Sequence, residues 1–274
     1  MGVLERLDRT EAFVDGKMLA GRIGHVGVMV FNQPERYNAI SSEMWGGVAD
    51  ILARFSADPE VRVLVMAGAG DKAFVSGGDI SQFAAQRNSA ESDAAFAQFT
   101  ARGRQALAAF DKPSIACLQG YCLGGGMAIA LEADLRIAGT GARLGIPATR
   151  LGIAYGIVPL ARLVRLVGPA RARMVLYTGR QFTAAEALAM GLVEQVVEDA
   201  QLADTVLELA QAIAGNAPLS VMAAKFTIDQ LLKEPADRDL ERVAQYTRAC
   251  MDSEDYREGR TAFMEKRKPV FHGR

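Results

Sequence analysis

The sequence predicts an α/β fold, and three observations support this class. Predominantly apolar runs occur at residues 61–67, 114–118 and 135–138, with Arg62 and Arg136 as charged exceptions, and short runs of this kind are typical of strands covered on both faces. Patterns with helical spacing separate the runs, over about 92–110 and after the glycines at 124–126. Strands that alternate with helices predict a sheet with helices packed on its faces.

Local signals define where several helices begin and end. Ser41 is expected to cap a helix that runs to about Phe55. Thr183 and Glu186 have the spacing of a capping box, and Gly191 is expected at the end of the short helix that follows them. The last third of the chain is therefore predicted to be mostly helical.

The chain is predicted to consist of a core and a helical extension. Gly168-Pro169 places proline where a helix begins, and residues 252–268 form a charged amphipathic pattern that predicts a last helix. No low-complexity linker separates these segments. We predict a core over residues 1–200 and a C-terminal helical region over residues 201–274.

Charge and cysteine content exclude several classes of function. The 31 basic and 32 acidic residues nearly cancel, which gives no support for nucleic-acid binding. The three cysteines fit neither a metal site nor a disulfide framework. The N-terminus lacks an apolar signal core, and no apolar run is long enough to cross a bilayer. We expect a cytoplasmic protein that uses no metal and contacts neither membrane nor nucleic acid.

Two glycine-rich turns each follow an apolar strand. The first glycine turn spans residues 74–80 and the second spans residues 120–126. Glycine lets a backbone approach a ligand closely, and the second turn also opens a helix, where free N–H groups favour negative charge. Two such N–H groups directed at one point would form an oxyanion hole. Gly68–Ala73 also fits the dinucleotide pattern G-x-G-x-x-A, but loop rather than helix is expected after it, so we reject that interpretation.

Five segments in order along the chain resemble the enoyl-CoA hydratase/isomerase, or crotonase, family. They are residues 32–39, 73–79, 120–126, 187–193 and 253–269. The resemblance implies a crotonase-like spiral of ββα repeats with a C-terminal helical trimerisation region. It also implies an acyl-CoA substrate, no cofactor other than the coenzyme A of that substrate, and a homotrimer or dimer of trimers.

The same resemblance assigns roles to individual residues. Gly78 and Gly125 match the two positions whose backbone N–H groups hold the thioester oxygen. The remaining positions are expected to line the substrate or its coenzyme A: Arg36, Asn38, Ala39, Ser76, Ala128, Ala148, Phe263 and Lys266. The last two often reach coenzyme A from a neighbouring subunit, although a solvated helix face explains Lys266 equally well.

The chain departs from the hydratase pattern at the catalytic carboxylates. Ala128 and Ala148 stand where hydratases of this family have the two glutamates that act on water. Gly156 stands where some isomerases and dehalogenases have an aspartate. Glu132 follows one helical turn after Ala128 and is expected to lie too deep to replace them. Asp79 is expected to order its own loop.

Tyr155 is the remaining candidate for a catalytic side chain. Its segment resembles the methylmalonyl-CoA decarboxylase branch of the family, which suggests decarboxylation of a small malonyl-type CoA ester. That reaction forms an enolate without removing a proton, and apolar surroundings favour loss of the carboxylate. Tyr155 is equally compatible with an ordinary buried aromatic. The alternatives are an atypical 2-enoyl-CoA hydratase or isomerase and a non-catalytic acyl-CoA-binding oligomer.

Overall fold

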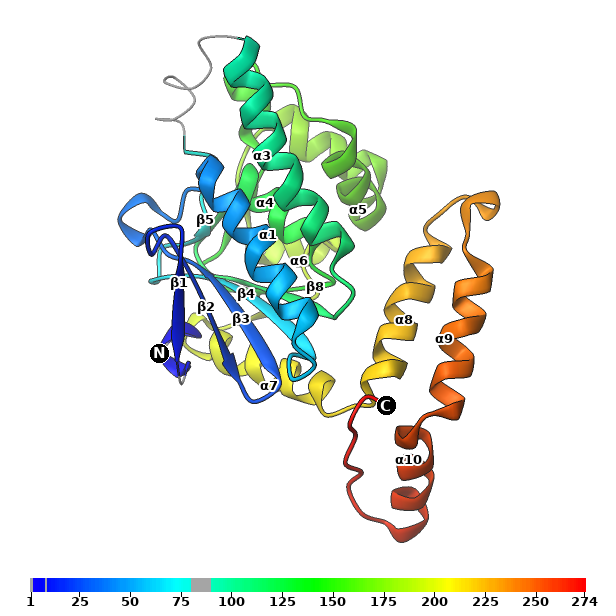
Figure 1. Cartoon of the computed structure of the whole chain (residues 1–274). Coiled ribbons are helices and arrows are strands. Elements are labelled where there is room, and N and C mark those ends of the chain that lie inside the picture. The colour runs from blue at the N-terminus through cyan, green and yellow to red at the C-terminus, as the bar shows by residue number, and fades with distance from the viewer. Residues whose placement is uncertain (1, 8, 80–89) are drawn as a thin grey trace.

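Two sheets wound into one spiral form the core of the protein (Figure 1). The computed structural model describes residues 2–7, 9–79 and 90–274, with the backbone alone over 90–99. The first glycine turn is therefore described as far as residue 79. The strands are β1 (Thr10–Phe13), β2 (Met18–Ile23), β3 (Val26–Phe31), β4 (Val63–Gly68), β5 (Ala73–Val75), β6 (Ser114–Leu118), β7 (Tyr121–Leu123), β8 (Leu135–Gly139), β9 (Arg143–Gly145), β10 (Phe182–Thr183) and β11 (Gln195–Val197).

Helices cover the sheets and extend beyond them at the C-terminal end (Figure 1). They are α1 (Ser42–Ala57), α3 (Ala90–Ala109), α4 (Gly125–Glu132), α5 (Ile157–Thr178), α6 (Ala184–Met190), α7 (Leu202–Ala214), α8 (Pro218–Leu231), α9 (Leu240–Asp252) and α10 (Glu254–Glu265). Short 3₁₀ helices are η1 (Leu4–Arg6), η2 (Pro34–Arg36), η3 (Pro147–Leu151), η4 (Asp199–Gln201) and η5 (Pro235–Asp237).

Strand order confirms the predicted spiral of ββα repeats. The larger sheet has the order β1-β2-β3-β4-β6-β8-β11, and the smaller one has the order β10-β9-β7-β5. Each repeat therefore supplies one strand to the larger sheet and the next strand to the smaller sheet, as β4 and β5, β6 and β7, and β8 and β9 do. From β3 to β11 the larger sheet is parallel.

The long apolar strands are buried on both faces, as their sequences predict. On β4, Leu64 and Met66 face the hydrophobic cluster that includes residues of α1 and α4, whereas Val63 and Val65 face the cluster that includes residues of α7. All four side chains are fully buried. Burial on alternate faces explains why the run is continuously apolar rather than alternating.

The predicted helix ends agree with the structure at several positions. The Ser41 side chain accepts a hydrogen bond from the Met44 amide and caps α1. The capping box of Thr183 and Glu186 is formed, and Gly191 ends α6 with a φ of 75°. The last helix predicted over 252–268 is confirmed as α10, which begins after its N-cap Ser253 and ends at Glu265, because Asp252 belongs to α9 and Lys266 is left-handed.

The C-terminal helices divide between the core and the extension. α7 packs on the larger sheet through Leu202, Val206 and Ala210, whereas α8, α9 and α10 stand apart from that sheet (Figure 1). Among the described residues, no single helix is long and apolar enough to cross a membrane. Residues 199–214 and 218–231 satisfy that test only as a pair bent by 104°.

Arg136 joins the end of α4 to the segment that follows α6. Its guanidinium donates to the carbonyl oxygens of Leu192, at 3.1 Å, and Ala133, at 2.6 Å, and it pairs with the Glu194 carboxylate. Arg136 is only 2% exposed. A buried guanidinium is tolerated only where carbonyl and carboxylate oxygens surround it.

Replacing Arg136 is therefore expected to destabilise the core. Arg136→Met keeps most of the side-chain volume but leaves the carbonyl oxygens and Glu194 without their donor. We expect a loss of about 3 kcal/mol in the free energy of unfolding, measured by urea denaturation. Arg102→Met removes an exposed ion pair with Asp50 and is expected to cost about 0–1 kcal/mol. Equal losses in the two variants would contradict this account.

Candidate active site

The two glycine turns meet at one edge of the smaller sheet. β5 and β7 run parallel, so the turns that follow them lie side by side. A Cβ placed on Gly125 would lie 3.4 Å from the amide nitrogen of Gly78. Gly77 has a φ of 130° and Gly124 a φ of 50°, values that L side chains rarely adopt. Strand pairing and glycine geometry together bring the two amides into contact range.

Each of these amides belongs to a peptide unit that is anchored through its carbonyl oxygen. The Gly77 oxygen accepts a hydrogen bond of 2.8 Å from the Ile40 amide. The Gly124 oxygen accepts from the Ala128 amide at 3.0 Å and from the Tyr155 hydroxyl at 3.0 Å. The C=O and N–H of a trans peptide point in opposite directions. Anchoring the oxygens therefore directs the Gly78 and Gly125 N–H groups away from the protein interior.

Both N–H groups are available to a ligand. Within the part of the chain that the structure describes, no acceptor lies within hydrogen-bonding distance of the Gly78 or Gly125 amide. Gly125 is also the first residue of α4, where free N–H groups concentrate the positive end of the helix dipole. The arrangement is suited to stabilising negative charge on a single oxygen atom.

Glycine is also required behind the second turn. A Cβ on Gly126 would lie 2.0 Å from the carbonyl oxygen of Val75, well inside van der Waals contact. Gly126 thus lets α4 begin directly against the end of β5. This close packing explains why the sequence has three consecutive glycines where two suffice for the turn.

The side chain of Asn38 anchors the loop that is predicted to line coenzyme A. Asn38 is fully buried, and its side chain accepts from the Gln33 amide and donates to the Ala69 and Ala73 oxygens. We expected Asn38 to line the substrate. The structure corrects this expectation for the side chain, because the amide group faces inward and its oxygen and nitrogen are both hydrogen-bonded to the backbone. Ala39 remains partly exposed on the same loop.

Ser76 belongs to the first glycine turn, and Arg36 contacts the end of that turn at Asp79. The Arg36 guanidinium is 57% exposed and pairs with the Asp79 carboxylate at 3.0 Å. This contact agrees with the expected role of Asp79 in ordering its loop. The Ser76 amide donates to the Tyr37 oxygen at 3.1 Å, which joins the loop of Arg36 to the oxyanion turn.

Ala128 and Ala148 supply apolar surface to the same region. Ala128 is 4% exposed and Ala148 is 8% exposed, and Ala148 belongs to the hydrophobic cluster against which Tyr155 packs. Their methyl groups have no proton to transfer. The structure therefore places no carboxylate at either of the two positions that carry glutamates in hydratases.

Tyr155 reaches the second glycine turn, but its hydroxyl proton is already used. The hydroxyl donates to the Gly124 oxygen. Burial raises the pKa of this hydroxyl to about 12, and the nearby charge of Arg104 lowers it only in part. Tyr155 therefore stays neutral at ordinary pH and positions the peptide that carries the Gly125 N–H. This positioning role was not foreseen from the sequence.

A group of charged residues behind Ala128 was also not foreseen. Glu132, whose side chain is 6% exposed, pairs with Arg162 at 3.3 Å, yet its Oε2 atom has no hydrogen-bond partner. Burial raises the pKa of this carboxyl, and the Arg162 and Arg104 charges oppose the increase. The three residues come from α4, α5 and α3, so their proximity depends on helix packing that no local pattern reveals.

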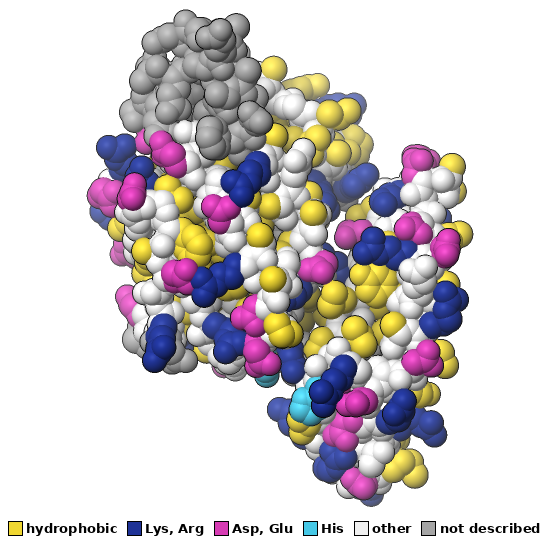
Figure 2. All heavy atoms as spheres, viewed as in Figure 1, with side chains coloured by type: hydrophobic (Ala, Val, Ile, Leu, Met, Phe, Trp, Pro, Cys, Tyr) yellow, Lys and Arg dark blue, Asp and Glu magenta, His cyan; other side chains and the backbone are white. Residues whose placement is uncertain are grey.

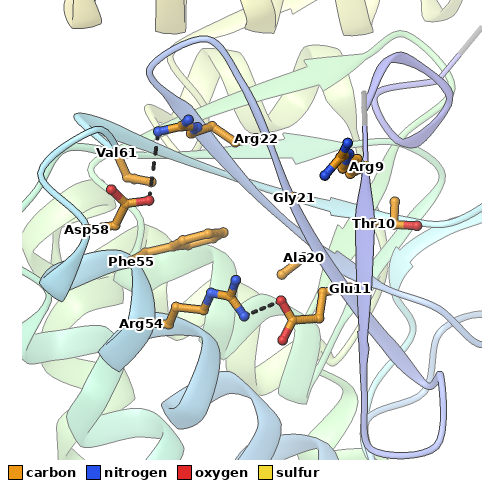
Figure 3. A pocket seen from close by; sticks show the side chains of 10 residues that line it. All are labelled: Arg9, Thr10, Glu11, Ala20, Gly21, Arg22, Arg54, Phe55, Asp58 and Val61. Atoms are coloured by element: carbon orange, nitrogen blue, oxygen red, sulfur yellow. Dashed lines mark hydrogen bonds and ion pairs between the residues drawn. The ribbon is translucent and has the colours of Figure 1, made fainter.

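A cavity elsewhere in the core is less suited to chemistry. It has a volume of about 390 Å³ and lies between β1, β2 and the end of α1 (Figure 3). Its charged side chains largely neutralise one another, because Arg54 pairs with Glu11 and Arg22 lies 3.8 Å from Asp58. Among the described residues, no group of three or more His, Cys, Asp or Glu is placed to hold a metal ion.

Comparisons with known proteins identify the family of this chain. A sequence model described as enoyl-CoA hydratase/isomerase matches residues 22–274. The chain belongs to the enoyl-CoA hydratase/isomerase family. It is 36% identical over 248 residues to the short-chain-enoyl-CoA hydratase of Clostridium acetobutylicum, covering 89% of this chain and 93% of that protein.

Two further relatives extend the comparison. The (E)-benzylidenesuccinyl-CoA hydratase of Thauera aromatica is 36% identical over 255 residues, covering 91% of this chain and 96% of that protein. The crystal structure of an enoyl-CoA hydratase/carnithine racemase from Magnetospirillum magneticum superposes with a TM-score of 0.91 at 33% identity, covering 99% of this chain and 100% of that one. The fold of this hydratase/isomerase-family chain is thus shared along its whole length.

Phe263 and Lys266 lie apart from the glycine turns of their own chain. Both are exposed on or just after α10, and Phe263 is 83% exposed. α10 lies at the far end of the C-terminal extension, away from β5 and α4 (Figure 1). The structure of one chain therefore does not bring these two predicted residues to the site of this family member.

The positioning role of Tyr155 has a spectroscopic test. Tyr155→Phe removes one of two donors to the Gly124 oxygen, so the Gly125 N–H is less fixed and less polarised. For a bound acyl-CoA we expect a smaller shift of the thioester C=O stretch to low wavenumber than in the parent protein, with an affinity changed by less than about threefold.

Tyr121→Phe, a substitution at the start of β7, is the matched control for Tyr155→Phe. Tyr121 is 38% exposed and packs its ring against Tyr37, so Tyr121→Phe is expected to leave the C=O stretch unchanged. An unchanged stretch in Tyr155→Phe as well would contradict the positioning role.

Proposed function

We propose that this protein is an acyl-CoA lyase that stabilises a thioester enolate between the amides of Gly78 and Gly125. The observation that carries the proposal is the pair of neighbouring, unpartnered N–H groups, each fixed through the carbonyl of its own peptide. Fixed donors stabilise developing charge without reorganising at the moment of reaction. Family membership supports the acyl-CoA thioester as the ligand.

Within that chemistry we favour decarboxylation of a small malonyl-type CoA ester. The bond between the α-carbon and the carboxylate breaks, its electron pair forms the enolate, and CO₂ leaves. The enolate then takes a proton at the α-carbon. No base is required for the first step, which fits a site with Ala128 and Ala148 in place of glutamates. Apolar walls also stabilise the charged carboxylate poorly.

We also propose that the C-terminal extension completes the site across a subunit interface. Several apolar side chains of this extension are exposed, among them Ile228, Leu231, Met251, Phe263 and Met264. Figure 2 shows hydrophobic side chains in the furrow between the core and α8. Exposed apolar surface of this kind marks contact sites. A homotrimer or dimer of trimers, expected from the resemblance, would bring Phe263 and Lys266 to a neighbouring coenzyme A.

An assay of CO₂ release tests the decarboxylation directly. We expect purified protein to release CO₂ from malonyl-CoA or methylmalonyl-CoA and to form the shortened acyl-CoA in equal amount. Calorimetric titration with coenzyme A serves as the control for a folded, ligand-competent sample. Protein that binds coenzyme A but releases no CO₂ from either ester would overturn this proposal.

Ala128 offers a test of the apolar wall. In Ala128→Glu a carboxylate would lie near the substrate carboxylate, and repulsion of this kind is about 4 kcal/mol at roughly 4 Å with an effective dielectric of about 20. Ala128→Gln has the same size without the charge. We expect decarboxylation to be at least about tenfold slower with Glu than with Gln, measured as kcat/KM at pH 8. Equal rates would argue against a substrate carboxylate at this position.

Hydration of a 2-enoyl-CoA is the second candidate reaction, favoured by the names of the relatives. It requires a group that activates water, which neither alanine supplies. Hydration of crotonyl-CoA at a rate unaffected by Tyr155→Phe would support this candidate. Tight binding of CoA esters without turnover of malonyl or enoyl thioesters would instead support a non-catalytic binding protein.

A further inference from the structure

Arg104 of α3 is a half-buried cation, and no anionic side chain among the described residues pairs with it. Its guanidinium lies over the Trp45 ring at 5.4 Å. Within the described residues no carboxylate lies within ion-pairing distance of it, and its buried Nε atom has no acceptor. An arginine in such surroundings has lost part of its hydration without a compensating charge, which is unfavourable unless a ligand supplies one.

Arg104 lies beside the oxyanion turn rather than on the outer surface. Its guanidinium lies over Trp45 of α1, one helical turn after Ser41, and the side chain of the preceding residue, Ile40, lies 3.4 Å from a Cβ placed on Gly125. In agreement with this position, the Arg104 charge lowers the pKa of both the Tyr155 hydroxyl and the Glu132 carboxyl. Tyr155 is hydrogen-bonded to Gly124, and Glu132 follows Ala128 by one helical turn, about 6 Å along α4. The cation therefore lies where α3 packs against α1 and α4, next to the helix that begins at Gly125.

Among the side chains that the structure describes, the local charges leave one positive charge in excess. Arg104 and Arg162 carry two positive charges, and Glu132 carries one negative charge that pairs with Arg162. The phosphates of coenzyme A cannot neutralise Arg104, because the pantetheine arm separates them from the thioester. An anion that reaches this depth must belong to the acyl group itself. A guanidinium with free N–H groups is suited to a carboxylate, which it holds in a defined plane.

We propose that Arg104 binds a carboxylate of the acyl group, so that the protein selects CoA esters of dicarboxylic acids over those of simple fatty acids. The inference rests on the proposed acyl-CoA site and names the substrate class for it. A carboxylate held in this way is oriented relative to the thioester plane. The cation stabilises the carboxylate before any bond breaks. Loss of Arg104 is therefore expected to weaken substrate binding and raise KM more than it lowers kcat.

Binding of matched ester pairs tests the proposal without turnover. Succinyl-CoA and butyryl-CoA have the same chain length and differ in a terminal carboxylate against a methyl group. Affinities are measured by calorimetry at pH 7. Malonyl-CoA and propionyl-CoA form a second pair, and stopped-flow binding traces replace calorimetry for malonyl-CoA because it is the proposed substrate.

The variants separate charge from structure. Arg104→Met is expected to weaken binding of the carboxylated ester in at least one pair by roughly 10- to 100-fold, the range for a hydrogen bond to a charged group, and to change the neutral ester by less than about twofold. Arg104→Lys keeps the positive charge but lacks the paired N–H donors of the planar guanidinium, so an intermediate loss of affinity for the carboxylated ester is expected. Arg102→Met, on the same helix and paired with exposed Asp50, is expected to change neither ester.

Each outcome decides the proposal. Equal losses for both members of each pair would show that Arg104 only supports the fold, and unchanged binding of both carboxylated esters would show that it does not contact the acyl group. If Arg104→Met fails to fold, as judged by thermal unfolding, Arg104→Lys gives the same comparison. Absence of CO₂ release with selective binding intact overturns the decarboxylation alone. CO₂ release with selectivity unchanged in Arg104→Met overturns the inference alone.

Discussion

The site depends on how two peptide units are anchored. An N–H group stabilises a developing oxyanion only if it is already oriented, since reorientation during the reaction would cost the free energy that the hydrogen bond supplies. Here the Ile40 amide anchors the peptide of Gly78, and the Ala128 amide and Tyr155 hydroxyl anchor that of Gly125. The spiral brings the two anchored peptides together, because pairing of β5 with β7 places both of them at one edge of the smaller sheet.

The rest of the core supports these two turns through buried polar contacts. Asn38 joins the loop before α1 to the ends of β4 and β5, and Arg136 joins the end of α4 to the segment after α6. Both side chains are buried and surrounded by backbone acceptors, so they fix loops that hydrophobic packing alone would leave free. The resemblance had pointed to Asn38 as a substrate contact, whereas its buried amide shows a structural role.

The polar groups near the site differ from those of a hydratase in kind and in origin. Two small side chains, Ala128 and Ala148, stand at the positions where the resemblance places water-activating carboxylates, while Glu132 lies one helical turn after Ala128 and pairs with Arg162. Tyr155 lies between the two regions and contacts the backbone of the oxyanion turn.

The sequence alone determined the α/β class, the long strands, most helix caps and the two glycine turns, because each depends on neighbours within a few residues. We expected a loop where the structure has β5, because a strand of three residues is too short to show the alternation of apolar and polar side chains that predicts a strand. Only the tertiary structure decided that the Gly78 and Gly125 amides are neighbours, that Asn38 faces inward, and that Arg104 has no carboxylate beside it among the described residues. Those facts depend on contacts between segments far apart along the chain, which packing alone establishes.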